Sequence, residues 1–405
     1  RSRGLGDVYK RQEPDTVSIL EGETLQFTAT GYDQLGSEMS LAPLDWAVKG
    51  NIGSIDNYGL FTAGDEPGIG AITVTFDNTF RAITGIIEVV GPAGGTTQIE
   101  QGHVFNSDFG VPSDDCIYFN AYIEGRNNEI LTQNSPGGGY ANGVWQINVG
   151  NFSSGWKAGD IVHIDYVDKC EGETGTIEFT LTNSGQNHDV TLSPISFQLV
   201  TTPTTNVNAI TLLKDTGVST AEELLNSIPH ATEIAYWDAE SQAYVAHSKG
   251  SGLFNFEVQP GYPYFITVTE DTTWTPTGSV PDPWPTFELI ATSLTNVNMI
   301  SLALDKLRIT NAEELGHTII NCKEIGKWDA ESQAYIFHTY GAPLFNFPVE
   351  VTSPYFVTIT APRIMAPAGV ENLGTMSLNV PQNEGGYIYN SDGSTPENGN
   401  IRFQA

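Results

Sequence analysis

The sequence has few basic residues, few cysteines and no long apolar run. Only 17 residues are Lys or Arg, against 48 Asp and Glu, so the formal net charge of the 405 residues is −31. A surface of this sign makes nucleic acid and anionic membranes poor partners. No apolar run approaches the ~18 residues that a membrane-spanning helix needs, so we expect no membrane span. Only 16% of the residues are charged, which reflects missing Lys and Arg more than the dense acidity of an extreme halophile.

The sequence also lacks the motifs of the common enzyme classes. It contains no Walker A loop, dinucleotide-binding fingerprint, HEXXH helix, paired Cys-X-X-Cys or G-X-S-X-G elbow. Together with the serial β patterns and the duplication described below, this absence predicts a chain that is not an enzyme.

The three cysteines are too few for a dense disulfide framework. Cys116 and Cys170 lie in one expected domain and can pair in an oxidising compartment, but the sequence leaves the pairing open, because a later copy has Asn400 in place of Cys116. Cys322 stands where the first repeat has Ala231, which predicts a small buried apolar residue and not a ligand or nucleophile.

The sequence contains a tandem repeat. The octapeptide Trp-Asp-Ala-Glu-Ser-Gln-Ala-Tyr occurs at 237–244 and again, unchanged, at 328–335, and Asn-Val-Asn, Leu-Phe-Asn-Phe and Pro-Tyr-Phe recur around it. Solenoid and propeller repeats have periods of roughly 20–50 residues, whereas most of these pairs lie farther apart. The spacing therefore predicts two copies of a small domain, at about 197–280 and 287–365, joined by a proline-rich, extended connection.

A second, longer-range repeat links the C-terminus to residues near 100. Gly386–Asp392 matches Gly102–Asp108, and Ile401 and Phe403 match Ile117 and Phe119 without a gap. We therefore expect 366–405 to be the truncated start of another domain like the one at 101–196. Residues 1–12 share no pattern with the rest and resemble a translated sequencing adapter of a metagenomic fragment, so they are set aside from the fold.

Residues 13–92 alternate in short segments separated by turn residues, as in a β-sandwich. Gly22–Gln34, Trp46 and Gly53–Gly64, above all its Gly-Leu-Phe-Thr-Ala-Gly turn, resemble the bacterial Ig-like domains (group 2, invasin type) of surface proteins and adhesins. The resemblance implies a β-sandwich spacer outside the cytoplasm, without an active site. The residues themselves agree, since no nucleophile stands with a base in this region.

Residues 101–196 carry a second all-β pattern, which predicts another β-sandwich domain. Strands are expected around Ile117–Ile123, Val144–Val149, Ile161–Tyr166 and Ile177–Thr182. Alternation in the last of these is typical of a sheet that is buried on one side. Two segments, 143–149 and 156–162, loosely resemble β-sandwich modules of large secreted bacterial proteins.

Each tandem module is predicted to be a small β-rich α+β unit with one short helix. Ser219–Glu222 and Thr310–Glu313 have the pattern of a capping box, which marks a helix start. Residues 237–256 then alternate like a hairpin, and 264–268 provides a closing strand. The overall fold class is mainly β: serial sandwich domains followed by these two repeats.

The repeated block carries candidate site residues. Asp238, Tyr244 and His247, with Asp329, Tyr335 and His338 in the second copy, offer a carboxylate, a phenol and an imidazole, which suit acid/base chemistry or metal binding in a concave pocket. The alternative is structural: Trp237 and Tyr244 pack in the core, Asp238 and Ser241 form a turn, and His247 caps a strand edge. We favour the structural alternative.

Exposed aromatic rings would instead bind sugar by stacking. The candidate ligand-binding residues are Trp237, Tyr244, His247, Trp328, Tyr335 and His338, and further tryptophans are Trp145, Trp156, Trp274 and Trp284. Trp284, in the connection between the modules, is expected either to be exposed or to fill a domain interface.

Two loops rich in Asp, Asn and Gly, at Asn106–Asp115 and Asn390–Asn400, contain the oxygen ligands that calcium prefers. Ordinary turn chemistry explains the same residues, and neither loop matches an EF-hand or a repeat-in-toxin loop. We therefore expect no cofactor and no metal site, with an interdomain Ca²⁺ as the alternative.

Two functions remain. The first is a non-catalytic, modular extracellular protein that acts as a stalk or adhesive spacer on a bacterial surface or in a secreted assembly, with other surface proteins or polysaccharide as partners. The second makes these domains the carbohydrate-binding accessory modules of a secreted polysaccharide-degrading enzyme. Duplication suits both, because linked modules add reach and avidity.

Overall fold

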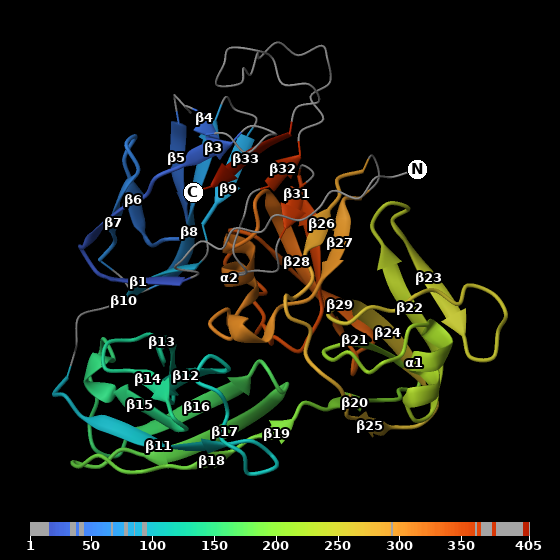
Figure 1. Cartoon of the computed structure of the whole chain (residues 1–405), viewed down its shortest axis with the longest axis horizontal. Coiled ribbons are helices and arrows are strands. Elements are labelled where there is room, and N and C mark those ends of the chain that lie inside the picture. The colour runs from blue at the N-terminus through green and yellow to red at the C-terminus, as the bar shows by residue number, and fades with distance from the viewer. Residues whose placement is uncertain are drawn as a thin grey trace. The chain divides into compact units, whose positions relative to one another are not determined.

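The computed structural model describes residues 16–32, 38–39, 44–65, 68–76, 80–84, 86–90, 95–292, 295–360, 363–365, 375–377 and 400–404. The chain divides into two compact units, residues 1–90 with 369–405, and residues 91–368. Figure 1 shows that both units are built almost entirely of strands. The prediction of a mainly β chain with one short helix in each tandem repeat is confirmed.

The described residues of the first unit form three sheets. Their strand orders are β1-β10-β8-β5 with β9 on β8, β2-β7-β6, and β32-β33-β3-β4. The strands are β1 (Thr16–Leu20), β2 (Thr24–Gln26), β3 (Thr30–Tyr32), β4 (Glu38–Met39), β5 (Leu44–Lys49), β6 (Gly53–Ile55), β7 (Leu60–Ala63), β8 (Gly68–Phe76), β9 (Phe80–Ile83), β10 (Ile86–Val90), β32 (Thr375–Ser377) and β33 (Asn400–Gln404).

The Gly-Leu-Phe-Thr-Ala-Gly segment of this unit forms a tight turn and a strand. Asp56 accepts the N–H groups of Tyr58 and Leu60 on one carboxylate oxygen, and Gly59 has a φ of +83°, which favours glycine. The strand that follows alternates, so that Phe61 is buried in the core of the unit. Most of 366–405 and all of 1–12 lie outside the described residues, so the predictions for those segments stay predictions.

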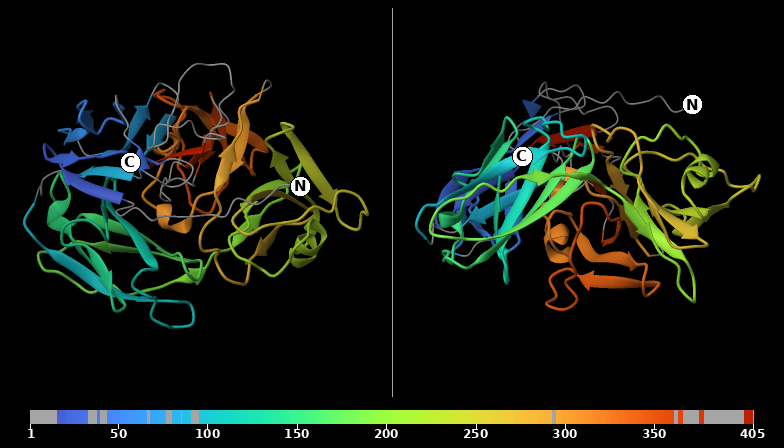
Figure 2. Two further views of the ribbon diagram at one scale, coloured as in Figure 1. Left: turned by 45° about the horizontal axis from the view of Figure 1, so that its top comes forward. Right: turned by 90° about the horizontal axis from the view of Figure 1, so that it is seen from below.

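The second unit begins with a two-sheet β-sandwich (Figures 1 and 2). The sheets have the orders β14-β15-β11-β18 and β13-β12-β16-β17-β19. The strands are β11 (Ile99–Phe105), β12 (Ile117–Ile123), β13 (Arg126–Thr132), β14 (Gly139–Ala141), β15 (Val144–Asn148), β16 (Ile161–Asp168), β17 (Glu173–Thr180), β18 (Val190–Thr191) and β19 (Ser193–Pro194), with a 3₁₀ turn at Val149–Asn151. Trp145, Phe119 and Tyr166 are fully buried between the sheets.

A disulfide bond joins Cys116, just before β12, to Cys170, in the turn between β16 and β17. The pairing that the sequence left open is therefore present. Asp168 supports the same turn, because its carboxylate accepts the N–H groups of Cys170 and Glu171. Cys322 is buried, as predicted, and is not part of the disulfide.

Each tandem module has a four-stranded antiparallel sheet, a two-stranded sheet and one helix. The first contains β20 (Phe197–Leu199), β21 (Val207–Thr211), α1 (Ala221–Ser227), β22 (Ala231–Asp238), β23 (Ala243–Ser248), β24 (Pro263–Val268) and β25 (Thr272–Trp274). The second contains β26 (Phe287–Leu289), β27 (Val297–Ile300), a 3₁₀ turn (Leu304–Lys306), α2 (Ala312–His317), β28 (Cys322–Asp329), β29 (Ala334–Thr339), β30 (Tyr355–Ile359) and β31 (Arg363–Met365).

The two modules share one strand order. It is β21-β24-β22-β23 in the first and β27-β30-β28-β29 in the second, so both contain a hairpin and the closing strand. The hairpin of the first module is formed by 231–238 and 243–248, so it begins and ends earlier than the predicted 237–256. The core of the first module, between its sheet and α1, contains Leu224, Leu225, Ile234 and Ile266. The opposite face of this sheet packs against the other module, in the interface described below.

The helix starts differ from the prediction by one residue. Thr220, not Ser219, is the N-cap of α1, and its capping box is completed by Glu223. Asn311 is the N-cap of α2 and accepts the N–H of Glu314. Ser219 with Glu222 and Thr220 with Glu223 can each form a capping box. The helix uses the second pair, so the carboxylate of Glu222 can bond to another partner.

No helix among the described residues is long and apolar enough to cross a membrane.

Candidate functional site

The repeated octapeptide builds the boundary between the two modules. Strand β21 lies against β28, and β22 lies against β27, so each module contacts the other through the same two elements. Phe265, Met299 and Phe356 form a small buried cluster there, with Trp237 and Trp328 packed against it. The sheet face opposite each helix is thus covered by the neighbouring module.

The two tryptophans of the octapeptides make reciprocal hydrogen bonds. The indole Nε1 of Trp237 donates to the carbonyl of Val297 at 2.8 Å, and the indole Nε1 of Trp328 donates to the carbonyl of Val207, also at 2.8 Å. Both rings are half-buried. Each indole therefore uses its apolar body for packing and its one donor for the other module.

The two glutamines of the octapeptides pair with the edge strand of the opposite module. Gln333 donates from Nε2 to the carbonyl of Val207 at 2.9 Å and accepts the N–H of Val207 on Oε1 at 3.0 Å. Gln242 makes the same pair of bonds to Val297, both at 2.9 Å. The side-chain amide completes the open edge of β21 or β27 as a neighbouring strand would.

Tyr244 and Tyr335 meet across the boundary, with a hydrogen bond between their hydroxyl groups. They are 44% and 39% exposed, so this is the wet margin of the interface. Partial burial raises the pKa of both phenols, so both stay protonated and one can donate to the other. Each ring also packs edge-on against the tryptophan of its own hairpin.

The candidate acid/base residues Asp238, Tyr244 and His247 do not come together, in line with the favoured structural alternative. Asp238 bonds within its own turn, where its carboxylate accepts the Ser241 hydroxyl and the N–H groups of Glu240 and Ser241. Tyr244 and His247 are three residues apart on β23 and so point to opposite faces of the sheet. The turn prediction for Asp238 and Ser241 is confirmed, and Asp329 repeats it with Ser332.

The two histidines are fully buried beneath the helices, on the face away from the module boundary. His247 Nε2 lies 2.9 Å from a carboxylate oxygen of Glu222, and Nδ1 lies 2.9 Å from the carbonyl oxygen of Leu253. His338 has the equivalent partners, Glu313 at 2.7 Å and Leu344 at 3.1 Å. Both ring nitrogens are occupied, so neither histidine offers a free group for metal or substrate.

Hydrogen bonds and nearby charge favour the charged forms of His247 and Glu222 in the first module. The hydrogen bond to the Leu253 carbonyl raises the pKa of His247 despite burial, with a further contribution from Glu222. Hydrogen bonds from the Gly250 N–H and from His247 lower the pKa of Glu222. In the second module, partial burial acts to raise the pKa of Glu313, but bonds from His338 and Gly341 outweigh it and the pKa is lowered.

The other tryptophans are internal or half-buried. Trp145 is fully buried and donates to the carbonyl of His188, Trp274 belongs to the core of the first module, and half-buried Trp156 donates to the carbonyl of Thr96. Trp284 is 6% exposed and bonds to the hydroxyl of Ser301. Of the two alternatives for Trp284, the structure shows the one in which it fills the module junction.

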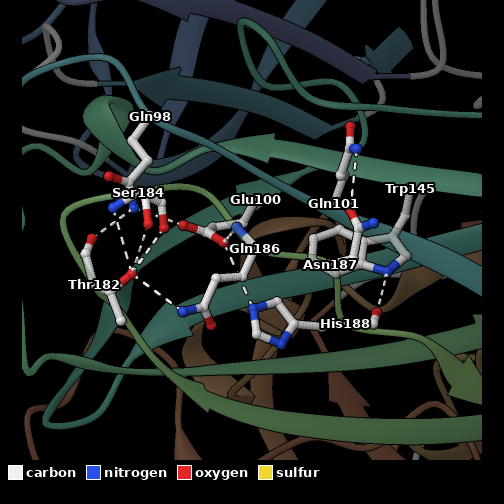
Figure 3. Close-up of polar contacts among 9 residues, drawn as sticks. All are labelled: Gln98, Glu100, Gln101, Trp145, Thr182, Ser184, Gln186, Asn187 and His188. Carbon is white, nitrogen blue, oxygen red and sulfur yellow. Dashed lines mark hydrogen bonds and ion pairs between the residues drawn. The ribbon is translucent and has the colours of Figure 1, made fainter.

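A separate polar network holds together the sandwich domain (Figure 3). Glu100 is almost fully buried, accepts Gln98 Nε2 at 2.6 Å and the Gln186 N–H at 2.8 Å, and lies 3.6 Å from His188 Nε2. Burial lowers the pKa of His188, although Glu100 opposes this effect. The network ties β11 and the residue before it to the 182–190 segment, because Gln98 also donates to the carbonyl of Thr182 and Glu100 accepts the Gln186 N–H.

In the loop at 106–115, for which turn chemistry was expected and calcium was the alternative, two aspartates accept backbone N–H groups. Asp108 accepts the Gly110 N–H, and Asp114 accepts the Asn142 N–H, each at 2.7 Å. Among the described residues, the cluster with metal-ligand spacing is Cys116, Asp168 and Cys170, but its cysteines are joined as a disulfide. The interdomain Ca²⁺ stays a prediction, and residues 390–399 lie outside the described part.

Comparisons with known proteins place this chain in no family. No family model and no curated protein matches it. Among solved structures, a streptococcal ancillary pilin is 11% identical (TM-score 0.19; 64% of this chain, 94% of the pilin). The Bacillus anthracis TIE protein is 10% identical (TM-score 0.18; 87% and 63%). A Salmonella alpha-2-macroglobulin variant is 9% identical (TM-score 0.15; 84% and 27%). These TM-scores carry no argument, so the Ig-like resemblance of 13–92 stays a prediction.

The sequence did not reveal which residues bond to the octapeptide across the module boundary. Gln242 and Gln333 lie inside the repeated block, and their partners Val207 and Val297 lie inside the repeated Asn-Val-Asn segment. The signal was present, because two segments of a module that recur together suggest that they act together. The sequence could not show that each segment contacts the other module and not its own.

Proposed function

We propose that this chain is a non-catalytic spacer segment of a modular extracellular protein, in which the tandem modules act as one rigid unit on a bacterial surface or in a secreted assembly. The observation that carries the proposal is the reciprocal interface. The tryptophans and tyrosines that the sequence offered as a binding site hold one module against the other, together with Gln242 and Gln333. A coupled pair of modules adds reach without a flexible joint.

One further feature supports a location outside the cytoplasm. The Cys116–Cys170 disulfide is typical of oxidising compartments. The partners of this segment would then be other surface proteins.

Carbohydrate binding is a second candidate, and one observation favours it. Tyr244, Tyr335 and Phe337 are 44%, 39% and 44% exposed, and the rings of Tyr335 and Phe337 are neighbours. An aromatic strip of this kind can stack on sugar rings. Under this alternative the modules would be accessory domains of a secreted polysaccharide-degrading enzyme.

A binding experiment on the full chain separates the two functions. The chain is applied to a glycan array and to insoluble polysaccharides, with and without Ca²⁺, beside a Phe337→Ser variant. Phe337 makes no hydrogen bond to the other module, so its replacement should leave the interface intact. Absence of binding to every glycan supports the spacer, whereas saturable binding that Phe337→Ser removes from a folded chain supports carbohydrate recognition.

A further inference from the structure

Three polar residues close one end of the sandwich interior, between its two sheets. Asp168 continues the series of buried interior positions along β16 and is 1% exposed. Glu173 stands directly opposite it on β17 and is 6% exposed. Asn106 comes directly after β11 of the other sheet, next in the interior series of that strand. These three residues are called the Asp168 cluster below.

The two carboxylates of the Asp168 cluster have hydrogen-bond donors but no positive partner. Glu173 accepts the N–H and the hydroxyl of Ser107 on its two oxygens. Asp168 accepts the N–H groups of Cys170 and Glu171, both on Oδ1. None of the Lys, Arg and His side chains that the structure describes forms an ion pair with either carboxylate. Like charges directly opposite on neighbouring strands destabilise a sheet, and buried charges are ordinarily paired or bound to a metal.

Two oxygen atoms of the cluster have no hydrogen-bond partner among the described residues. They are Asp168 Oδ2 and Asn106 Oδ1, and both atoms are buried. The side chains are neighbours: burial is the main effect that raises the pKa of Asp168, Glu173 adds to the rise, and a hydrogen bond from Asn106 opposes it. Buried acceptors are ordinarily satisfied in folded proteins, so two adjacent unpaired oxygens indicate a ligand.

The charge and the atom types of the cluster select the ligand. A water molecule would satisfy the two oxygens but would leave both carboxylate charges uncompensated. Carboxylate and amide oxygens are the ligands of hard cations, and two negative charges suit a divalent one. Ca²⁺ accepts an irregular set of oxygens, whereas Mg²⁺ needs near-ideal octahedral geometry. Ser107, beside the cluster, is exposed, so water can complete the coordination of Ca²⁺.

The turn that carries Asp168 is held in place by the rest of the fold. The disulfide between Cys116 and Cys170 closes it from one side. Gly172 in the same turn packs against the first module, where a Cβ atom would lie 2.7 Å from Cε of Lys214. Lys214 makes no ion pair with the cluster, although it reaches this turn. The ligand atoms are therefore preorganised, which lowers the cost of binding, and they lie beside a junction with the first module.

We propose that the Asp168 cluster binds one Ca²⁺ ion through Asp168 Oδ2, Asn106 Oδ1 and the carboxylate of Glu173, with water in the remaining positions. The ion joins the two sheets at this end of the sandwich. The site shares Asn106 with the loop at 106–115, but its two carboxylates lie outside that loop, so the loop pattern could not reveal it. The inference goes beyond the spacer function and does not depend on the interface between the modules, so each can fail separately.

The test is thermal unfolding of the full chain by calorimetry, in chelator and then in Ca²⁺. Extracellular Ca²⁺ modules have dissociation constants of about 0.1–1 mM, so Ca²⁺ is added to about 10 mM, and the same concentration of Mg²⁺ controls for screening of the acidic surface. Asp168→Asn keeps an oxygen that can accept the two N–H groups and removes the charge. Asp165→Asn is the matched control, because Asp165 lies on the same strand but on the opposite face, where it accepts the Thr176 hydroxyl.

Ca²⁺ should raise the melting temperature of the sandwich domain by about 5–10 °C in the wild type and in Asp165→Asn, and Mg²⁺ should raise it much less. Asp168→Asn should lose most of this rise. In chelator it should melt at or above the wild-type temperature, because it no longer buries two opposed charges. Glu173→Gln, which keeps an acceptor for Ser107, should also lose most of the rise, and it decides the outcome if Asp168→Asn is destabilised.

Three results would overturn the proposal. A wild type that does not respond to Ca²⁺ would assign the two oxygens to a water molecule. An equal rise in Mg²⁺ would assign the effect to screening of the acidic surface. A rise that survives in both Asp168→Asn and Glu173→Gln would place the ion elsewhere on the chain.

Discussion

Tyr244 and Tyr335 are equivalent residues of two repeated modules, 91 positions apart, and their hydroxyl groups bond to each other. Equivalent residues meet in this way when a local two-fold axis passes between them. The Trp–Val and Gln–Val contacts obey the same symmetry, since each of these bonds made by one module has its counterpart from the other. The tandem repeat is therefore arranged as an intramolecular dimer.

Loss of both interface tryptophans should uncouple the modules. Trp237→Ala with Trp328→Ala removes two half-buried rings and two intermodule hydrogen bonds. We expect each change to cost about 3 kcal/mol of coupling, because removal of a large packed aromatic side chain has this magnitude. Calorimetry should show the modules melting in one transition in the wild type and in two in the double variant.

The control for this experiment is Trp274→Ala, which removes a core ring of the first module and no intermodule bond. It should lower the melting temperature by destabilising that core, while the two modules still melt in one transition. A single shared transition in the Trp237→Ala/Trp328→Ala chain would show that other contacts couple the modules.

The His247–Glu222 pair should make the first module most stable at mildly acidic pH. The pKa of His247 is raised above its ordinary 6.5, so its contribution is complete below that value and is lost as pH rises through the folded pKa. The pKa of Glu222 is lowered below its ordinary 4.5, so its contribution is complete above that value and is lost as pH falls through the folded pKa. Urea unfolding across this range should place the maximum between 4.5 and 6.5.

Glu222→Gln tests the assignment of this pH dependence. The variant keeps a hydrogen-bonding side chain beside His247 but removes the charge, so the difference in unfolding free energy between pH 5.5 and pH 8 should shrink. Glu240→Gln is the matched control, since Glu240 lies in the exposed turn of the same hairpin. An unchanged pH profile in Glu222→Gln would assign the dependence to another group.

Helix capping should follow the register of the structure. Thr220→Ala removes the side-chain acceptor of the Glu223 N–H and should cost about 1 kcal/mol. Ser219→Ala leaves that bond in place and should cost less. The free energies of unfolding of the two variants are measured side by side. If the helix began one residue earlier, Ser219→Ala would cost more than Thr220→Ala.

Reduction of the disulfide should destabilise the sandwich domain alone. The bond between Cys116 and Cys170 closes a loop with a sequence separation of 54, for which the loss of chain entropy on unfolding corresponds to about 4 kcal/mol. Cys116→Ser with Cys170→Ser should lower the melting temperature of this domain and leave the tandem modules unchanged. Equal unfolding curves with and without reductant would contradict a stabilising role.

The local structure of the modules could be predicted from sequence because local rules decide it. Alternation around the Asp-Ala-Glu-Ser turn predicts the hairpin, and the Asp238–Ser241 bond within that turn needs no distant residue. The helix was predicted for the same reason. Its start was predicted one residue early, because Ser219 and Thr220 both suit an N-cap and only the tertiary partner of Glu222 decides between them.

The candidate site could not be predicted because long-range pairing decides it. Trp237, Tyr244 and His247 are close in sequence, yet strand alternation sends His247 to the helix and the two rings to the other module. From the sequence alone, a repeated block that contains Trp and Tyr is equally compatible with a binding face and with an interface. Only the position of Val297 beside Trp237 separates these alternatives.

The rigid coupling of the two modules is tested most directly by the distance between them in solution. Spin labels at Thr232→Cys and Lys323→Cys, which follow the equivalent residues Ala231 and Cys322 and are exposed, are placed in a Cys322→Ala background and measured by pulsed electron paramagnetic resonance. The account predicts one narrow distance distribution that broadens when Trp237→Ala and Trp328→Ala are added. A broad distribution before those changes would show that the modules move independently and would contradict the account.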